Sequence, residues 1–345
     1  MADDVAAPAE IVITGAAGWL GQNLVRAVAG DRTRVRCLVR TDADIAALAI
    51  VGRSVEPVAG DIRDPATLDR LFDGVAAGAT VVHTAATIHP DGRVRELFDV
   101  NVGGTQLTLD RARRAGAGRF VHISSNSPFG ANATADSRFT ETSAPNPYLG
   151  YGRSKLEAEQ LVSRSHGRGD LAAVVVRPPW FYGPFQPERQ STWFAALRRG
   201  RFPLVGAGTQ RRSMVFSGNL VHGVLRAEVA AAAPGRAWWI ADPEPYELRT
   251  ILATVREALA AEGLAVTGGV PCLPRTVSSV AAAVDARVQG AGRYVQALHV
   301  LGELKDTIAC DVTAARTELG YDPQTTLLDG MRASVRWCLA NGHGL

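Results

Sequence analysis

The sequence Y151-GRS-K155 places a tyrosine and a lysine four residues apart. In a helix, this spacing puts Tyr151 and Lys155 on one face. Hydride transfer to or from a carbinol carbon needs a group that moves the hydroxyl proton, and a phenol with a pKa of about 10 is poorly matched to neutral pH. A neighbouring lysine ammonium favours the phenolate and is expected to lower that pKa. A nearby serine hydroxyl would then hold the substrate oxygen.

A second pattern, IVITGAAGWLG (11–21), runs from a short apolar stretch into Gly15, Gly18 and Gly21. Gly15 permits a sharp turn, Gly18 lets a pyrophosphate approach the backbone, and Gly21 lets a helix lie close to a strand. The start of that helix offers free N–H groups and the positive end of its dipole. Tight packing alone is the other explanation for three glycines. Because the motif follows the first strand and opens a helix, it predicts dinucleotide binding.

The first half of the chain alternates between apolar, β-branched stretches and helical patterns. The expected strands are 10–14, 34–39, 55–60, 80–85, 119–124 and 172–177, and the expected helices include 19–29, 64–75 and 96–116. Short, fully apolar strands that alternate with helices indicate a parallel sheet covered on both faces. The predicted fold class is therefore α/β, with a doubly wound parallel sheet of the Rossmann type.

The rhythm changes after residue 177, where several prolines interrupt the pattern. One further strand-like run, RAWWIA (236–241), is expected to return to the sheet, and the rest of the chain is mainly helical. We expect a dinucleotide-binding domain from 10–177 plus about 213–243. A smaller, mainly helical substrate-binding domain would comprise about 178–212 plus 244–345.

The overall composition narrows the function classes. The chain has 345 residues, of which 46% are hydrophobic, and its net charge is only +3. This balance gives no field that would favour nucleic acid or a membrane surface. The four cysteines are scattered and form no metal-ligand pattern. With no signal peptide and no membrane-spanning run expected, we predict a cytoplasmic protein with a small-molecule substrate and no bound metal.

Taken together, these motifs resemble the extended short-chain dehydrogenase/reductase superfamily, the NAD(P)-dependent epimerase/dehydratase family. The resemblance rests on TGAAGWLG (14–21), the serine-rich strand end ISSNSPFG (123–130), YxxxK, and RPPWFYGP (177–184), and it covers about residues 10–340. Among its branches, the chain looks closest to enzymes similar to 3β-hydroxysteroid dehydrogenase. An enzyme that uses a nicotinamide cofactor is therefore expected.

The resemblance implies roles for individual residues. Tyr151 is the acid/base, Lys155 binds the nicotinamide ribose, and Ser125 orients the substrate, with Ser127 as the alternative serine. Asp61 would contact the adenine, although a turn or helix-capping role is also open for this aspartate. The other implied cofactor contacts are Trp19, Leu20, Ile62, Thr84, Ala85, Ala86, Asn101, Ser124 and Pro178.

The end of the second strand determines the cofactor type. Relatives that prefer NAD carry an acidic residue there for the ribose hydroxyls. This chain has Val39 at that position, followed by Arg40, whose guanidinium can pair with a 2′-phosphate. NADP is therefore favoured over NAD, with an ordinary surface arginine as the other interpretation.

The substrate remains open between two classes. Trp180 occupies a position where epimerases usually have an asparagine. Other aromatic residues lie in or close to the motifs above: Phe129, Phe181, Phe185 and Trp193. Together they suggest either an apolar substrate cleft or a hydrophobic core between the domains. Asn126 and Ser127 replace the acids of dehydratases. These residues favour a hydrophobic alcohol or ketone, steroid-like or from secondary metabolism.

Arg212 supports the alternative, a nucleotide-sugar 4-epimerase with tightly held NAD, because epimerases place an arginine there for the substrate phosphate. A non-catalytic NADP-binding regulator is a third class, which the joint presence of serine, tyrosine and lysine disfavours. Relatives often form homodimers through the YxxxK helix and the helix before it, so a homodimer is expected.

Overall fold

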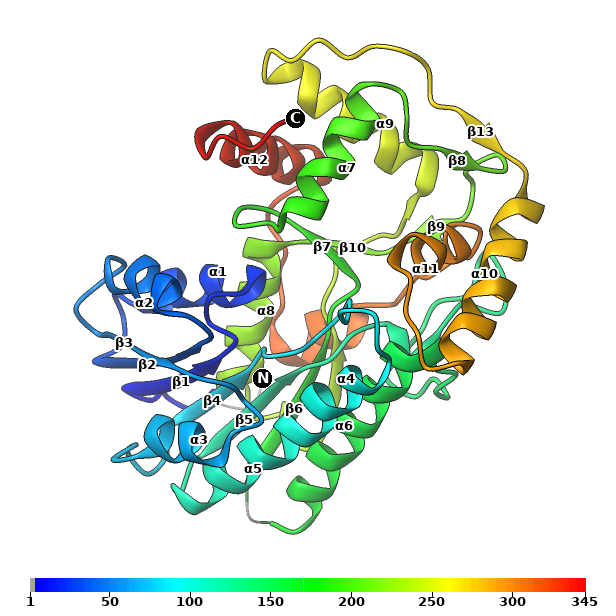
Figure 1. The fold of residues 1–345 in the computed structure, drawn as a ribbon. Coiled ribbons are helices and arrows are strands. Elements are labelled where there is room, and N and C mark those ends of the chain that lie inside the picture. The colour runs from blue at the N-terminus through cyan, green and yellow to red at the C-terminus, as the bar shows by residue number, and fades with distance from the viewer. Residues whose placement is uncertain (1–3, 170) are drawn as a thin grey trace.

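A seven-stranded parallel sheet forms the centre of the fold (Figure 1). The computed structural model describes residues 4–169 and 171–345. The strand order is β11-β6-β5-β4-β1-β2-β3. The strands are β1 (Glu10–Thr14), β2 (Arg34–Val39), β3 (Val55–Ala59), β4 (Thr80–His83), β5 (Arg119–Ile123), β6 (Ala172–Arg177) and β11 (Ala237–Trp239). The order reverses between β1 and β4, and this is where a doubly wound sheet opens its ligand crevice.

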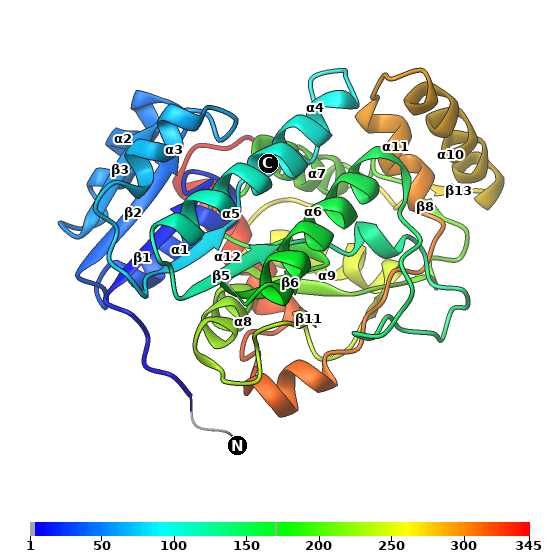
Figure 2. The same cartoon turned by 90° about the horizontal axis from the view of Figure 1, so that it is seen from below.

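Helices cover both faces of this sheet. One face packs against α1 (Trp19–Val28), α2 (Asp42–Ala49) and α8 (Ser217–Val229), through a core that includes Leu24, Leu48 and Val224. The other face packs against α3 (Pro65–Phe72), α5 (Thr105–Arg114) and α6 (Leu149–Gly167), through residues such as Leu68, Leu109 and Val162. Figure 2 shows α5 and α6 side by side across the sheet. The predicted doubly wound α/β fold is confirmed.

The observed elements follow the predicted pattern with small differences. All seven expected strands form, with ends that differ from the expectation by no more than two residues. The long helical pattern at 96–116 is divided into α4 (Arg95–Phe98), the π-helical segment η1 (Asp99–Gly104) and α5. Two adjacent glycines, Gly103 and Gly104, lie in η1 and lower its intrinsic preference for regular α-helix.

The later segments pack above the carboxyl ends of the strands. Short strand pairs join β7 (Trp180–Tyr182) to β10 (Met214–Phe216), β9 (Arg211–Arg212) to β12 (Tyr246–Glu247), and β8 (Leu204–Val205) to β13 (Cys272–Leu273). The helices here are α7 (Glu188–Arg198), α9 (Leu248–Ala261), α10 (Arg275–Gly290), α11 (Gln296–Glu303) and α12 (Leu327–Ala340). The 3-10 segment η2 (Ser127–Phe129) precedes α6, and the π-helical segment η3 (Ala315–Leu319) precedes α12.

These later helices have a hydrophobic core of their own. Phe194 on α7, Leu252 on α9 and Val335 on α12 are fully or almost fully buried within it. In Figure 1 these three helices lie together, apart from the sheet. Within residues 4–169 and 171–345, no helix combines the length and the apolar character that a membrane crossing requires.

Candidate functional site

A large cleft lies between the carboxyl ends of the strands and the later helices. Its volume is about 1210 Å³, and its walls combine both groups of elements. The predicted site residues that line it are Gly15, Gly18, Trp19, Leu20, Gly21, Arg40, Thr84, Ala86, Ser124, Ser125, Asn126, Tyr151, Lys155, Pro178, Trp180, Phe181 and Arg212. Motifs that are far apart in the sequence therefore meet in one cavity.

The glycine turn occupies one end of this cleft. Gly15 has a φ of +68°, and a Cβ there would lie 2.8 Å from the backbone nitrogen of Ala85. A Cβ on Gly21 would lie 2.2 Å from the carbonyl oxygen of Gly15, so this glycine is required by packing. Gly18 is the N-cap of α1, whose first turn contains no acidic residue. No side chain caps this helix, and its first residues line the cleft. The N–H groups of the first turn and the positive end of the helix dipole are thus available to a pyrophosphate.

Four predicted cofactor contacts are not among the residues that line the cleft: Asp61, Ile62, Ala85 and Asn101. Asp61 accepts hydrogen bonds from Arg63, and that interaction lowers the pKa of its carboxyl. Ile62 is buried against Gly104. Asn101 lies behind the wall, where its side chain donates to the Thr87 carbonyl (2.9 Å) and to Ser154 Oγ (2.9 Å).

Asn101 therefore contacts the strand-end loop and α6, the helix that carries YxxxK. Its Oδ1 also accepts from the Thr87 backbone N–H at 2.8 Å, so both ends of the amide hold this loop. Thr87 itself lines the cleft. Asn101 thus contributes to the cleft indirectly, by holding the backbone of Thr87 in its wall.

The residues of the YxxxK motif lie in the first turns of α6 and are buried. The Lys155 ammonium donates to the Ile123 carbonyl at the end of β5 (2.7 Å), which fixes its position under the cleft. An ammonium has three N–H donors, so others remain for a ligand. Tyr151 and Lys155 are 9% and 1% exposed, and both line the cleft.

Burial dominates the titration of both groups. It raises the pKa of Tyr151 to about 12, against the opposing effect of a hydrogen bond with Ser125. It lowers the pKa of Lys155 to about 8, against the attraction of Glu159. The expectation that Lys155 lowers the Tyr151 pKa differs from this result: in the chain alone, loss of hydration outweighs other effects. The phenol is thus protonated at neutral pH.

The serines at the end of β5 lie next to Tyr151. Ser125 Oγ lies 3.2 Å from Ser127 Oγ and 3.3 Å from Asn126 Oδ1. Of the two candidate serines, Ser125 is the one whose hydroxyl acts on the Tyr151 phenol, by lowering its pKa against the effect of burial. This geometry puts two hydroxyl groups together, as is needed to hold one substrate oxygen.

The entry to the catalytic helix is held by the later helices. Leu149, its first residue, has a φ of +52°, an uncommon value for a residue with a side chain. The next N–H, that of Gly150, donates to Gln289 Oε1 on α10 (3.1 Å). Gln289 in turn donates to Asp285, which also pairs with His299 Nδ1 at 2.9 Å. The sequence analysis missed this network, because no local pattern links residues 150, 285 and 299.

Aromatic side chains form much of the other wall. Trp180 and Trp193 pack with ring centroids 4.8 Å apart, and Phe202 meets Trp193 edge to face at 5.9 Å. The rings of Phe181 and Trp19 pack with their centroids 4.4 Å apart, which links this wall to the glycine turn. Leu248, Val300, Leu304 and Ile308 add further apolar surface. The cleft is thus lined with aromatic and aliphatic groups beside Tyr151.

Two of the aromatic residues expected at the cleft lie elsewhere. Phe129 is buried in a cluster with Phe139 and Trp239, and the Arg177 guanidinium lies 4.4 Å from its ring centre. Phe185 packs between Trp337 and Arg26. For these two positions the core interpretation was the right one, because the aromatic composition alone does not say which way a ring points.

Charged and polar groups missed by the sequence analysis also line the cleft. Arg189, on α7, and Glu303 and His299, on α11, project into it. The predicted Arg212 donates to the carbonyl oxygen of Glu303. Arg189 follows a proline-rich loop whose path no motif specifies.

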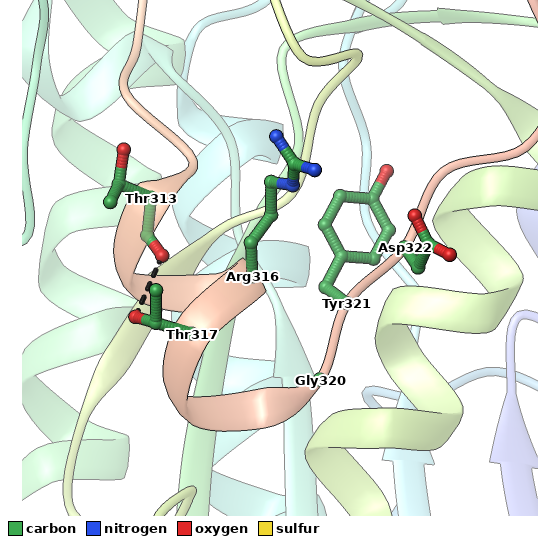
Figure 3. Close-up of a pocket in the computed structure, with 6 residues that line it drawn as sticks. All are labelled: Thr313, Arg316, Thr317, Gly320, Tyr321 and Asp322. Carbon is green, nitrogen blue, oxygen red and sulfur yellow. Dashed lines mark hydrogen bonds between the residues drawn. The ribbon is translucent and has the colours of Figure 1, made fainter.

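A second, smaller hollow lies beside η3 (Figure 3). Thr317 Oγ1 donates to the Thr313 carbonyl (2.9 Å), and the Tyr321 hydroxyl donates to the Ala241 carbonyl (3.0 Å). These bonds are local and structural. Since the hollow shares no lining residue with the large cleft, it is not part of the candidate site.

Comparison with known proteins agrees with this geometry. The model of the family described as "NAD dependent epimerase/dehydratase family" matches residues 11–241. The chain belongs to this family. It is thus an enzyme of the extended short-chain dehydrogenase/reductase type that uses a nicotinamide cofactor.

Several family members are similar over much of their length. An uncharacterized protein, y4nL, of Sinorhizobium fredii is 41% identical over 96% of each chain. A 3 beta-hydroxysteroid dehydrogenase/Delta 5-->4-isomerase of Mycobacterium tuberculosis is 31% identical over 72% of this chain and 69% of its own. A 4-hydroxy-2-methyl-3-oxo-4-farnesyl-3,4-dihydroquinoline-1-oxide ketoreductase of Stigmatella aurantiaca is 29% identical over 93% and 94%.

A solved family structure has the same fold. DesIV, a dTDP-glucose 4,6-dehydratase from Streptomyces venezuelae crystallised with NAD and TYD bound, superposes with a TM-score of 0.74. It is 25% identical, and the alignment covers 96% of this chain and 97% of that one. The family thus spans several reactions on one architecture, and the substrate must be argued from the cleft.

The cleft suits the family's dinucleotide. The uncapped start of α1 meets the demands of a pyrophosphate, and the buried Lys155 has spare donors for a ribose. Within the described part of the chain, no cluster of three or more His, Cys, Asp or Glu side chains is arranged to hold a metal ion.

Proposed function

We propose that this enzyme transfers a hydride between a nicotinamide cofactor and the carbinol or carbonyl carbon of a hydrophobic alcohol or ketone, steroid-like or from secondary metabolism. One observation carries the proposal: Ser125, Tyr151 and Lys155 share a cleft whose opposite wall is aromatic and aliphatic. The names of two relatives, a 3 beta-hydroxysteroid dehydrogenase and a ketoreductase that acts on a farnesylated ring, support a substrate of this kind.

Each residue has a distinct role in the proposed reaction. The cofactor supplies or accepts the hydride. Tyr151 gives its phenolic proton to the substrate oxygen during reduction and takes it back during oxidation. Its raised pKa keeps the phenol protonated in the chain without cofactor. Ser125 holds the same oxygen. Lys155, fixed by the Ile123 carbonyl, holds the ribose.

The cofactor preference is a separate part of the proposal. Arg40 is exposed on the rim of the cleft, while Val39, at the position of the acid in NAD-preferring relatives, is buried. A charged rim residue favours a 2′-phosphate, so we expect NADP in preference to NAD. We also propose a homodimer in the cytoplasm and the division into two domains given above.

The nucleotide-sugar 4-epimerase remains the second candidate because Arg212 lines the cleft. Its guanidinium, however, already donates to a backbone carbonyl. This makes it a weaker candidate for a sugar-nucleotide phosphate than an unpaired arginine would be.

A substrate panel tests the proposal. The protein is incubated with NADPH and hydrophobic cyclic ketones, with NADP and the matching alcohols, and separately with UDP- and dTDP-hexoses. We expect cofactor turnover with the hydrophobic compounds and no interconversion of sugar epimers. Epimer interconversion without net cofactor turnover would establish the second candidate instead.

A further inference from the structure

Three arginines line the cleft: Arg40 on its rim, which is proposed above to bind the 2′-phosphate of the cofactor, and Arg189 and Arg212 along its wall, which differ in their contacts. Arg212 donates to the Glu303 carbonyl, and the charges of Glu303 and Asp306 also attract it. Arg189 is the second residue of α7, and no hydrogen bond or ion pair of its side chain is found among residues 4–169 and 171–345. Of these two wall arginines, Arg212 has a protein partner for its guanidinium, and Arg189 has none among the described residues.

Arg189 lies at the reacting end of this cleft. Its charge acts on the Tyr151 phenol itself and on two further groups, Tyr294 and His89, which hydrogen-bond to each other. The Arg189 side chain is exposed to the solvent of the cleft, although partial desolvation lowers the pKa of its guanidinium. Its N–H donors are therefore accessible to an anion that enters the cleft, with which they can form charge-assisted hydrogen bonds.

The cofactor phosphates do not explain this arginine. The turn that suits them, around Gly18 and Trp19, has its own N–H donors at the start of α1. The position of Tyr151 marks the reacting carbon, so a group near Arg189 lies near that carbon. The fork of N–H donors on arginine matches a carboxylate in particular.

We propose that Arg189 binds a carboxylate that the substrate carries close to its reacting carbon. The inference rests on the proposed function and narrows its substrate to hydrophobic hydroxy acids and the corresponding keto acids. The apolar body of such a molecule faces Trp180 and Trp193, its hydroxyl faces Tyr151, and its carboxylate faces Arg189. Arg212, which the sequence links to the substrate phosphate of the alternative epimerase, donates to the Glu303 carbonyl.

A matched pair of probes tests the charge alone. 3-Hydroxydecanoate and 3-hydroxydecanamide have the same chain and hydroxyl, but only the first has a carboxylate. Binding of each to the NADP-loaded protein is measured by isothermal titration calorimetry at low salt, and turnover of each is followed by NADPH absorbance. The variants are Arg189→Met, Arg189→Lys and, as a control, Arg199→Met, which removes an exposed charge at the other end of α7, outside the cleft.

We expect the wild-type protein to bind the acid about tenfold more tightly than the amide, as is typical of a charge-assisted hydrogen bond. Arg189→Met abolishes this preference, Arg189→Lys retains part of it, and Arg199→Met leaves it intact. Equal affinity for both probes, no binding of the acid, or a preference unchanged in Arg189→Met would overturn the inference.

The two readouts separate this inference from the function on which it rests. A preference for the acid in binding, with neither probe oxidised, would count against the proposed oxidoreduction of this class and leave the carboxylate site standing. Oxidation of both probes with no preference for the acid would contradict the carboxylate site alone.

Discussion

The two ends of the cleft are held in different ways. At the cofactor end, side chains and turns are fixed by nearby backbone: Lys155 donates to the Ile123 carbonyl, Thr84 donates to the Thr14 carbonyl, and Gly21 packs on Gly15. These contacts all lie at the carboxyl ends of β1, β4 and β5, which are neighbours in the sheet. The geometry of this end follows from the sheet itself.

At the substrate end, contacts join segments about a hundred residues apart. Arg212 on β9 is bound to the Glu303 carbonyl on α11, and Gln289 on α10 holds the N–H of Gly150 on α6. The Arg189 guanidinium there has no hydrogen bond or ion pair with the described residues. From this difference we infer that the reacting groups are positioned by the sheet that family members have in common. Substrate specificity then depends on how the later helices of this chain pack.

The largest effect is expected where the two ends meet, at Tyr151. Tyr151→Phe keeps the ring and removes the proton that the reaction moves, so turnover should fall by about 10²- to 10⁴-fold. Cofactor affinity, set at the other end, should change little. Steady-state kinetics and a cofactor titration measure the two quantities. Near-normal turnover would remove Tyr151 from the mechanism.

The next effect tests whether backbone packing fixes the cofactor end. In Gly21→Ala the new methyl would lie 2.2 Å from the Gly15 carbonyl oxygen, so the free energy of unfolding should fall by about 3 kcal/mol. Gly18→Ala, with a contact of 3.1 Å, is the matched control, and it should chiefly weaken cofactor binding. Urea unfolding of both variants without cofactor gives the comparison. Equal stability of the two variants would contradict it.

A third prediction uses the buried Lys155. Its pKa is about 8 in the folded chain and about 10.4 when unfolded, so above pH 8 the folded state loses this proton first. Stability must then rise with pH over that interval. Between about pH 7.5 and 9.5, the cofactor-free protein should gain about 2 kcal/mol relative to Lys155→Met. Chemical unfolding of both proteins at both pH values measures this change. If the difference in their free energies of unfolding is the same at the two pH values, the pKa of Lys155 is not lowered in the folded state.

The smallest effect concerns the rim of the cofactor end. Arg40→Ala should weaken NADP binding about tenfold and leave NAD binding unchanged, because the exposed guanidinium can pair only with the 2′-phosphate. Fluorescence titration with each cofactor measures this ratio. If both affinities fall equally, Arg40 does not distinguish the cofactors.

The same contrast explains what could be predicted from the sequence. The glycine turn, the strand ends and YxxxK can each be recognised within a stretch of about ten residues. The parallel sheet then brings these local motifs together, because its strand ends lie along one edge. The sheet, most of its helices and the cleft position of Tyr151, Lys155 and Ser125 were thus predictable. The helix α2 was missed, since its single fully buried apolar residue, Leu48, leaves a weak periodicity.

The substrate end could not be predicted in the same way. Nothing near Arg189 in the sequence shows that it faces Tyr151, and the pairing of His299 with Asp285 depends on how α10 and α11 fold back on each other. Phe129 and Phe185 show the same limit, because an aromatic residue near a motif packs wherever the tertiary structure leaves apolar surface.

The central claim is an oxidoreductase that exchanges its nicotinamide cofactor. Native mass spectrometry of the purified protein, followed by titration with NAD and NADP, tests it most directly. We expect a protein that carries no retained dinucleotide and takes up one NADP per chain at a lower concentration than NAD. A protein that retains NAD through purification and does not exchange it for NADP would contradict the claim and favour the epimerase.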